Sequence, residues 1–335
     1  MLDLFSRLRR RILEGAPAVK EHGEGAFNPG WKPQRSAGGC QWNDPPGIAS
    51  RMESLVCGGQ SRWRGNAVRY ALDRWGNRTP KTGLRALVIG GADPGRVMAW
   101  LADIPGLAGV TLITGATNED LTEEFTLPGL TVEEKNWDDL AADGTHHLAI
   151  ADYAFSRLTG LAPRLQRLED ALTPGGLLVV RDYVGPARYQ FTDGQMRVVN
   201  AILPLLPEIW RRDVSGTLRD AQEPPPVAWV MNSDPLAAVA SAEVRAAVTA
   251  GFNLVEETSL GGTVLMPLMA GISHNFLDPS PECQSLLDAL WSAEQTLLEA
   301  KLLPADHWFA VAAKRPGKQV GSVSDGRFID RDPVM

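Results

Sequence analysis

The sequence predicts an α/β fold, with a mainly parallel sheet that is covered by helices on both faces. A buried strand, a glycine-rich turn and an amphipathic helix follow one another in the run LRALVIGGADPGRVMAWLADI, which starts at Leu84. Strand-like and helix-like segments then alternate up to Tyr183, as a parallel sheet requires. The length of 335 residues is sufficient for one enzyme-sized body with additions.

Residues 1–80 are expected to form an arm and helices that precede the sheet. Met1 to Ile12 places apolar residues on one helical face with arginines around it, which predicts a short basic amphipathic helix. This helix either docks on the body of the protein or attaches to a membrane surface or a partner. Glu14 to Asp44 is rich in Gly, Pro and polar residues, and apolar residues return at helical spacing between Ile48 and Trp75.

The main domain is expected to span residues 81–315 and the tail residues 316–335. Its seven strands are predicted at Leu84–Ile89, Val110–Thr114, Leu130–Glu134, Leu148–Tyr153, Leu177–Tyr183, Phe252–Glu257 and Trp308–Ala313. Helices are predicted at Leu161–Leu172 and Cys283–Leu303. Residues 185–250 do not alternate and contain three consecutive prolines, so this stretch is interpreted as a mainly helical insertion that caps the substrate site.

Composition and charge exclude several classes of protein. Hydrophobic residues make up 44% and charged residues 22% of the chain, which is typical of a globular protein. The net charge of -7 argues against a nucleic-acid partner, because such partners need clustered Lys and Arg. The three cysteines are far apart, without the spacing of a zinc site or a disulfide framework, so no metal is expected and a reducing cytoplasm fits best. No apolar stretch approaches the length of a membrane span.

The glycine-rich turn GGADPG, at residues 90–95, is the most informative ligand-binding feature. Glycine lets a ligand approach the backbone closely, and the following helix offers free N–H groups. A dinucleotide site would prefer GxGxxG and an acidic residue at the end of the second strand, where Thr114 and Gly115 stand. A nicotinamide-dependent reductase is therefore disfavoured, while a purely structural turn stays open.

Several motifs in order resemble the class I S-adenosylmethionine (SAM) dependent methyltransferases over nearly all of Leu84 to Ala313. LVIGGADPG is similar to the first motif of that family, LAIADYAFSRL to the fourth strand and its helix, and LTPGGLLVV to the segment leading into the fifth strand. GFNLVEE and HWFAVAAKR resemble its last two strands. The resemblance implies a seven-stranded Rossmann-like sheet whose last strand is antiparallel. RDYVGPARYQF is similar to a signature after strand five in a bacterial subgroup, of the type DYVGPxRxQ.

The resemblance also implies SAM as cofactor and assigns the residues that hold its methionine and ribose. Gly90, Gly91 and Gly95 would line this part of the ligand, with Asp93 near the amino acid end. The family usually closes the second strand with an acidic residue, which is absent here unless Asn118, Glu119 or Asp120 substitutes for it. A degenerate SAM site, kept for structure or for regulation of a partner, is the alternative.

The adenine and the methyl group would be met by residues after the third and fourth strands. On this resemblance Asn136, Trp137 and Asp138 flank the adenine, while Asp152 and Tyr153 face the methyl group.

Three residues are candidates for catalysis. His274, in a segment that could return over the active face, could act as a general base for a hydroxyl acceptor. Tyr183 and Arg188 follow the fifth strand, and Arg188 could pair with a substrate carboxylate or phosphate, or instead hold the insertion to the core. His146 and His147 precede the fourth strand, opposite the ligand-binding edge, and are expected to be structural or exposed.

The predicted function is methyl transfer from SAM to a small-molecule or glycan acceptor, on oxygen. A catalytically silent binding or scaffold protein with the same fold is the alternative. The sequence leaves open whether the chain forms a homodimer.

Overall fold

The structure is a computed structural model, and it describes residues 41–57, 66–90, 94–113, 127 and 130–315. Several predictions lie outside these residues. They are the N-terminal amphipathic helix, Gly91 and Asp93 of the glycine turn, the acidic substitutes between Asn118 and Asp120, and the tail of residues 316–335.

Seven strands form one sheet, and the predicted Rossmann-like architecture is confirmed. The strands are β1 (Leu84–Ile89), β2 (Leu107–Ile113), β3 (Val132–Lys135), β4 (His146–Asp152), β5 (Leu172–Tyr183), β6 (Asn253–Gly261) and β7 (His307–Ala313). Their order is β3-β2-β1-β4-β5-β7-β6. The first five strands pair in parallel, whereas β7 runs antiparallel to both β5 and β6.

Helices lie against the sheet and beyond its carboxyl edge. The α-helices of the described residues are α2 (Pro46–Cys57), α3 (Ala67–Trp75), α4 (Pro94–Ala102), α5 (Leu161–Ala171), α6 (Asp193–Ile202), α7 (Val227–Ser233), α8 (Ser241–Gly251), α9 (Leu265–Met269) and α10 (Pro281–Glu299). Short 3-10 turns are η1 (Gly76–Arg78), η2 (Trp137–Asp139), η3 (Phe155–Arg157), η4 (Ala187–Tyr189), η5 (Leu203–Leu205), η6 (Glu208–Arg211) and η7 (Ser273–Leu277).

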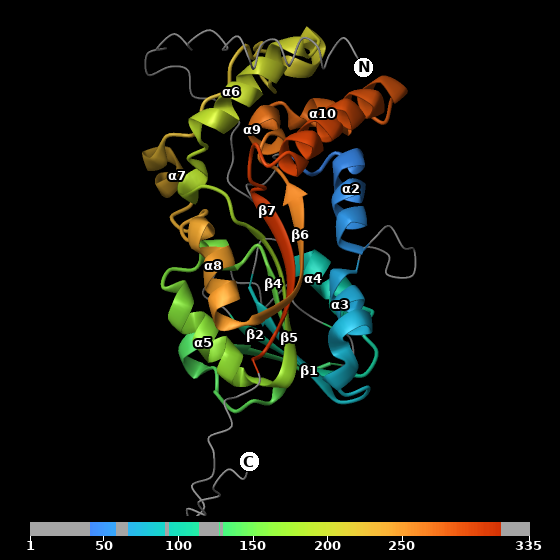
Figure 1. Cartoon of the computed structure of the whole chain (residues 1–335), viewed down its shortest axis with the longest axis vertical. Coiled ribbons are helices and arrows are strands. Elements are labelled where there is room, and N and C mark those ends of the chain that lie inside the picture. The colour runs from blue at the N-terminus through green and yellow to red at the C-terminus, as the bar shows by residue number, and fades with distance from the viewer. Residues whose placement is uncertain (1–40, 58–65, 91–93, 114–126, 128–129, 316–335) are drawn as a thin grey trace, which may run out of the picture.

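Helices cover both faces of the sheet, so side chains on both faces of its central strands are buried. Val179 and Val180, neighbours on β5, belong to two different clusters of buried apolar residues, one on each face. Helices α5 and α8 cover one face, while α3 and α4 cover the other (Figure 1). Successive side chains of a strand therefore point to opposite faces, and every second one points toward the face that α3 and α4 cover.

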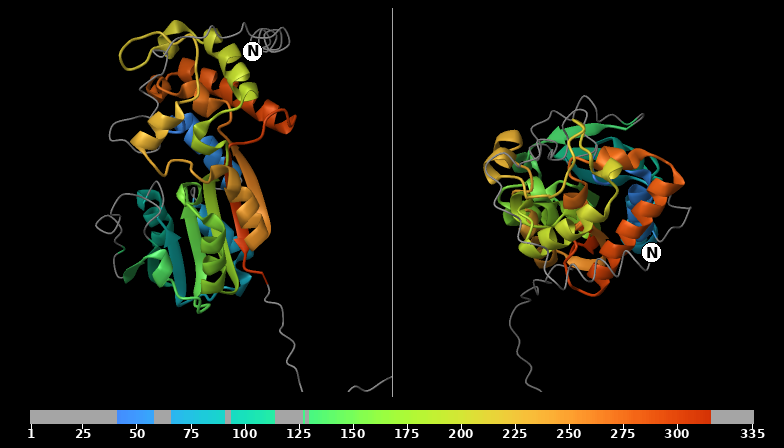
Figure 2. Two further views of the ribbon diagram at one scale, coloured as in Figure 1. Left: turned by 90° about the vertical axis from the view of Figure 1, so that its left-hand side faces the viewer. Right: turned by 90° about the horizontal axis from the view of Figure 1, so that it is seen from above.

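Helices α6, α7, α9 and α10 gather beyond the sheet and form a helical cap (Figure 2). The cap is built from two excursions of the chain, one between β5 and α8 and the other between β6 and β7. Both excursions start at the edge where the parallel strands end, because Tyr183 of β5 and Gly261 of β6 both pair with His307. Helix α8 falls inside the predicted insertion of residues 185–250, but it packs beside α5 on the sheet.

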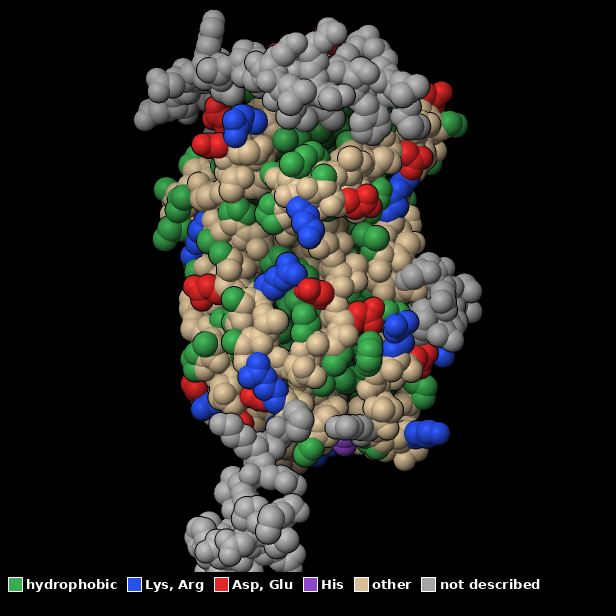
Figure 3. Space-filling model, viewed as in Figure 1, with side chains coloured by type: hydrophobic (Ala, Val, Ile, Leu, Met, Phe, Trp, Pro, Cys, Tyr) green, Lys and Arg blue, Asp and Glu red, His purple; other side chains and the backbone are tan. Residues whose placement is uncertain are grey.

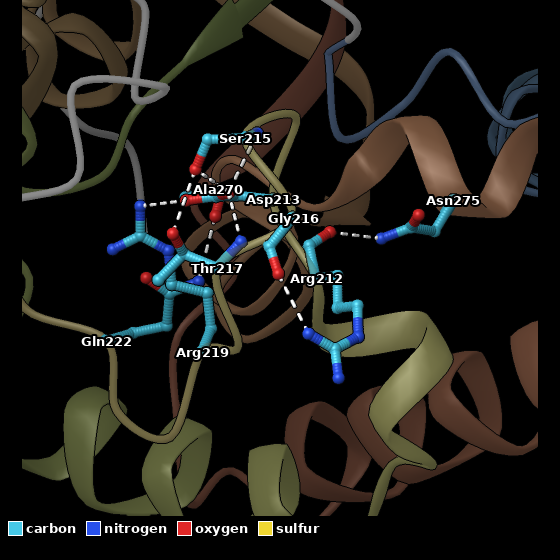
Figure 4. A network of polar contacts seen from close by, with 9 residues as sticks. All are labelled: Arg212, Asp213, Ser215, Gly216, Thr217, Arg219, Gln222, Ala270 and Asn275. Atoms are coloured by element: carbon cyan, nitrogen blue, oxygen red, sulfur yellow. Dashed lines mark hydrogen bonds and ion pairs between the residues drawn. The ribbon is translucent and has the colours of Figure 1, made fainter.

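A polar loop ties the first excursion to the second (Figure 4). The carboxylate of Asp213 accepts hydrogen bonds from the backbone N–H groups of Ser215 and Thr217, at 2.9 and 3.0 Å. Asn275 donates to the carbonyl of Arg212 at 2.7 Å, and Gln222 donates to that of Ala270 at 2.9 Å. The two excursions therefore form one connected cap.

The surface carries both signs of charge. On the face drawn in Figure 3, Lys and Arg side chains are interspersed with those of Asp and Glu. In the part of the chain that the structure describes, no helix is long and apolar enough to cross a bilayer. The same residues contain no group of three or more His, Cys, Asp or Glu side chains placed to hold a metal ion.

Candidate functional site

The site expected from the sequence lies at the carboxyl edge of the sheet, between β1 and β4. Strand order reverses at this point, and α/β sheets bind their ligands at such a crevice. Gly90 directly follows β1 and is buried, and its N–H donates to the carbonyl of Ile113 at 3.0 Å. Gly95 is the second residue of α4. Gly91 and Asp93 lie outside the described residues, so Gly90 and Gly95 mark the two ends of the turn.

Two arginines hold the carboxylate of Asp152, the last residue of β4. Arg181 of β5 donates from Nε and Nη2 at 2.7 and 3.1 Å, and Arg96 of α4 donates from Nε at 3.0 Å. Asp152 is only 1% exposed. Burial acts to raise the pKa of Asp152, but the charges of Arg181 and Arg96 outweigh it and the net pKa is lowered. Two positive charges therefore meet one negative charge at this edge.

Tyr153 follows Asp152 with a backbone φ of 52°, in the left-handed region that large side chains rarely adopt. Its N–H donates to the carbonyl of Arg181 at 2.6 Å, and its ring lies 5.4 Å from the Arg181 guanidinium carbon. The side chain is buried, and burial raises the pKa of Tyr153 to about 12. Such strained residues gather at functional sites, where surrounding contacts hold them in place.

His307, the first residue of β7, meets Tyr153 across this edge. Its Nδ1 lies 3.0 Å from the Tyr153 hydroxyl, and the residue is fully buried. Burial and then the charge of Arg181 lower the pKa of His307 to about 3, so its ring is neutral at physiological pH. His307, Arg96 and Arg181 are not among the site residues predicted from the sequence, although all three contact residues that are.

The residues predicted to flank the adenine lie at η2. Trp137 is 6% exposed and packs in the same apolar cluster as Ile89 and Ile113, the last residues of β1 and β2. The Nε1 atom of Trp137 is buried and has no hydrogen-bond partner among the described residues. Asn136 and Asp138 are exposed, and Asp138 pairs with Arg167 at 3.3 Å.

The three predicted catalytic residues have different places in the fold. Tyr183 ends β5, is 1% exposed, and its ring lies 5.3 Å from that of His307. Arg188 donates from Nη1 to the carbonyls of Pro235 and Ala237, at 2.6 and 3.1 Å. Arg188, Pro235 and Ala237 all lie within the predicted insertion of residues 185–250, so these bonds join two parts of that insertion. His274 is half-buried on η7, which packs against η6 within the cap.

His146 and His147 lie at the amino end of β4, as expected, and make structural hydrogen bonds. His146 Nε2 lies 3.1 Å from the hydroxyl of Thr111, and His147 Nδ1 accepts from the N–H of Arg85 at 3.1 Å. Both histidines are thus separated from Asp152 by the length of the strand.

Buried carboxyl groups hold the loops around the site. Asp182 accepts from the N–H groups of Phe155 and Tyr183 at 2.7 and 2.8 Å, and burial raises the pKa of Asp182 to about 7. Asp306 accepts from Gln195 Nε2 at 2.7 Å, and burial raises the pKa of Asp306 to about 8. Gln195 belongs to α6, so this bond links the start of β7 to the cap.

The raised pKa of Asp306 predicts a pH-dependent effect of its replacement by asparagine. The folded chain binds a proton at Asp306 more tightly than the unfolded chain, whose Asp titrates at about 3.9. Its contribution to stability is therefore present at low pH and is lost between about pH 4 and pH 8. Asp306→Asn should be more stable than the wild type at pH 8, by about 1 kcal/mol or more, with a smaller difference at pH 5.

Urea unfolding of both chains at pH 5 and pH 8 measures this difference. The other carboxyl groups are present in both chains, so the comparison isolates Asp306 together with its charge coupling to Glu294. Glu299→Gln, which removes a carboxylate at the exposed end of α10, is measured beside it as the control substitution. Equal differences at the two pH values would mean that Asp306 ionises normally in the folded chain.

The arrangement combines a positively charged edge with a buried hydroxyl. The Arg96–Asp152–Arg181 cluster can attract a ligand carboxylate, and the buried Trp137 N–H can donate to a ligand acceptor. Tyr153 and His307 lie beside this cluster and supply polar atoms shielded from water. These features suit a ligand with a charged end and a reacting group that is kept dry.

Comparison with known proteins finds matches only among solved structures. No protein-family model matches the chain, and no curated protein matches its sequence. The crystal structure of the [4+2]-cyclase SpnF shares 16% identity over 95% of this chain and 94% of that one, with a TM-score of 0.40. A SAM-dependent methyltransferase from Mesorhizobium loti shares 16% identity over 72% and 97% of the two chains, with a TM-score of 0.37.

A further solved structure is the N-methyltransferase NodS from Bradyrhizobium japonicum. It shares 12% identity over 81% of this chain and 98% of that one, with a TM-score of 0.37. Identities and TM-scores at these levels are too low to assign an activity to this chain. Its own strand order, with β7 antiparallel between β5 and β6, is what establishes the Rossmann-like methyltransferase fold.

Proposed function

We propose that this protein binds SAM at the carboxyl edge between β1 and β4 and transfers its methyl group to an oxygen of a small-molecule or glycan acceptor. The observation that carries the proposal is the double arginine clamp on Asp152, beside the glycine turn and at the point where strand order reverses. The order of sequence motifs from Leu84 to Ala313 supports the same function.

The residues of this edge fit the groups of SAM. Arg96 and Arg181 bring two positive charges to the carboxyl edge, and positive charge there favours a ligand carboxylate such as that of the methionine part. Arg96 lies in the first turn of α4, whose N-terminus also favours negative charge. The buried Nε1 of Trp137 lacks an acceptor among the described residues, which an adenine nitrogen or a ribose hydroxyl would supply.

The chain's own residues would orient the reactants and exclude water. When bound, SAM would supply an electrophilic methyl group to the acceptor oxygen. Arg96 and Arg181 would fix the charged end of the ligand, while Tyr153 and His307 provide a dry surface beside Asp152. The cap over this edge would bind the acceptor.

Calorimetry with SAM and with decarboxylated SAM tests the proposed clamp. The wild type should bind SAM at least about tenfold more tightly than the decarboxylated compound, because one charge-assisted contact is missing. Arg96→Gln should weaken SAM binding by a similar factor and leave the binding of decarboxylated SAM nearly unchanged. Arg167→Gln, which removes a half-exposed arginine near Trp137, is the matched control and should keep the carboxylate preference.

If Arg96→Gln weakened the binding of SAM and of decarboxylated SAM by the same factor, Arg96 would not contact the ligand carboxylate. No binding of SAM by the wild type at millimolar concentration would remove the proposed function altogether.

A catalytically silent binding protein is the second candidate, and the burial at the centre of the site favours it. Tyr153, Tyr183 and His307 are each at most 2% exposed. Such a protein would bind S-adenosylhomocysteine in the same calorimeter cell yet transfer no label from methyl-labelled SAM to a cell extract.

A further inference from the structure

The ring of His307 is enclosed by groups from four parts of the chain. Trp42, Tyr153 and Tyr183 place their rings 5.0, 5.6 and 5.3 Å from it. Gly262 also approaches so closely that a Cβ there would lie 2.9 Å from His307 Nε2. A side chain held this tightly can impose one orientation on its hydrogen-bond partner.

The two ring nitrogens of His307 have partners of different character. Nε2 lies 3.5 Å from the sulfur of Met266, and a thioether can accept a hydrogen bond weakly but cannot donate one. Nδ1 lies 3.0 Å from the hydroxyl of Tyr153, which can do either. In a neutral imidazole one nitrogen donates and the other accepts, so Nε2 carries the hydrogen and Nδ1 accepts. Tyr153 therefore donates its own hydrogen to His307.

This direction leaves the Tyr153 oxygen with lone pairs to offer. Among the described residues, the bond to His307 is the single hydrogen bond of the Tyr153 hydroxyl. The hydroxyl hydrogen is donated to His307, so toward a ligand the Tyr153 oxygen can act only as a hydrogen-bond acceptor. The strained backbone of Tyr153 and the contact with the Arg181 guanidinium hold the ring at the end of β4.

We propose that His307 is a positioning residue that takes the hydrogen of the Tyr153 hydroxyl, so that the Tyr153 oxygen accepts a hydrogen bond from the methyl acceptor. This inference rests on the proposed function, and it selects methyl acceptors that present an O–H group at the reacting atom. A substrate whose reacting oxygen is anionic and carries no hydrogen would place two hydrogen-bond acceptors against each other, which weakens its binding. The acceptor class is thus an alcohol or a phenol, and not a carboxylate or phosphate oxygen.

The tautomer of His307 is the first test, and it needs neither SAM nor an acceptor. Nitrogen NMR of the full chain labelled at histidine, with the signal assigned through His307→Asn, reports which ring nitrogen carries the hydrogen. We expect a neutral ring with hydrogen on Nε2 from about pH 5 to pH 9, and a shifted Nδ1 signal in Tyr153→Phe. Hydrogen on Nδ1, or titration at about pH 6.5, the ordinary value for histidine, would overturn the proposal.

Methyl transfer is the second test, using methyl-labelled SAM and the low-mass fraction of a cell extract. Tyr153→Phe should lower kcat about tenfold and leave the Kd for SAM unchanged, because the hydroxyl that it removes contacts the acceptor and His307 but not SAM. His307→Phe should lower kcat similarly, and His307→Asn, whose amide oxygen can still accept from Tyr153, should retain more activity. His147→Gln, at the amino end of β4, is the control.

The outcomes of the two tests separate the proposals. Wild-type transfer rates in Tyr153→Phe, or label found on carboxylates, would overturn the role of the Tyr153 oxygen. Absence of SAM binding in the wild type would overturn the proposed function and the acceptor class with it. The NMR result would still decide how His307 and Tyr153 are arranged.

Discussion

Replacing Asp152 with alanine is expected to lower the free energy of unfolding by about 3–5 kcal/mol, because it leaves the charges of two arginines close together without their partner. Asp152 is 1% exposed, and the side chains of Arg181 and Arg96 are 12% and 30% exposed. Urea unfolding at pH 7 measures the loss. The variant should also bind SAM differently from the wild type in calorimetry, since the same arginines face the proposed carboxylate.

Asp138→Ala is the matched control for this prediction. Asp138 also lies near the carboxyl edge and pairs with one arginine, but its side chain is fully exposed. Exposed pairs contribute about 0–1 kcal/mol, so this variant should unfold nearly as the wild type does. Similar losses in both variants would mean that the Asp152 cluster is no more important than a surface ion pair.

The effect of Asp152→Ala should also depend on pH. The folded pKa of Asp152 is lowered, since the two arginine charges outweigh burial, which acts to raise it. A carboxyl group with a lowered folded pKa contributes stability above its unfolded pKa, about 3.9, and loses it as pH falls through the folded value. The difference between variant and wild type should therefore be full at pH 7 and shrink below about pH 4.

The sheet could be predicted from the sequence because its strands carry local signals. The first strand, Leu84–Ile89, is predicted with its observed bounds, since its apolar residues, interrupted only by Arg85, end at glycines. The fifth is predicted from Leu177, but β5 begins at Leu172, because residues of the TPGG turn also belong to the strand. A glycine turn is locally a stop signal, and only the neighbouring strand shows that Leu172 pairs with His146 before the register shifts to Leu177 and Leu148.

The polar contacts of the site could be predicted only in part. Asp152 and Tyr153 are marked by their position after an apolar strand, and this position puts them at the edge where ligands bind. Arg96, Arg181 and His307 come from a helix, a second strand and the last strand, so no spacing in the sequence links them. One available signal is Arg181 itself, a charged residue inside the apolar run LLVVRDY, where burial requires a partner.

The cap, too, could be predicted from the sequence only in part. Residues 185–250 are recognised as an insertion, but α8 at its end packs on the sheet, and the excursion between β6 and β7 completes the cap. The hydrogen bonds from Asn275 and Gln222 that join the two excursions connect residues 63 and 48 positions apart. Contacts of this kind follow from tertiary packing and leave no periodic pattern in the sequence.

Gly262→Ala is expected to be among the most destabilising single substitutions in the chain, with a loss of about 3 kcal/mol or more in the free energy of unfolding. Gly262 has a φ of +82°, where an L-residue costs about 1–2 kcal/mol. In addition, a Cβ at this position would overlap His307 Cδ2 and lie 3.1 Å from Trp42 Cζ2. Forcing an extra carbon into such packing costs about 1–3 kcal/mol more.

Gly216→Ala separates the two causes of this loss. Gly216 has nearly the same φ, +83°, but nothing lies within 4 Å of a Cβ built there, so only the backbone cost remains. Urea unfolding should therefore show a clearly smaller loss for Gly216→Ala than for Gly262→Ala. In the surviving folded fraction of Gly262→Ala, the histidine NMR signal of His307 should move, because the ring must shift away from the new methyl group. Equal losses at the two glycines would show that His307 is not held as tightly as the hydrogen bond to Tyr153 requires.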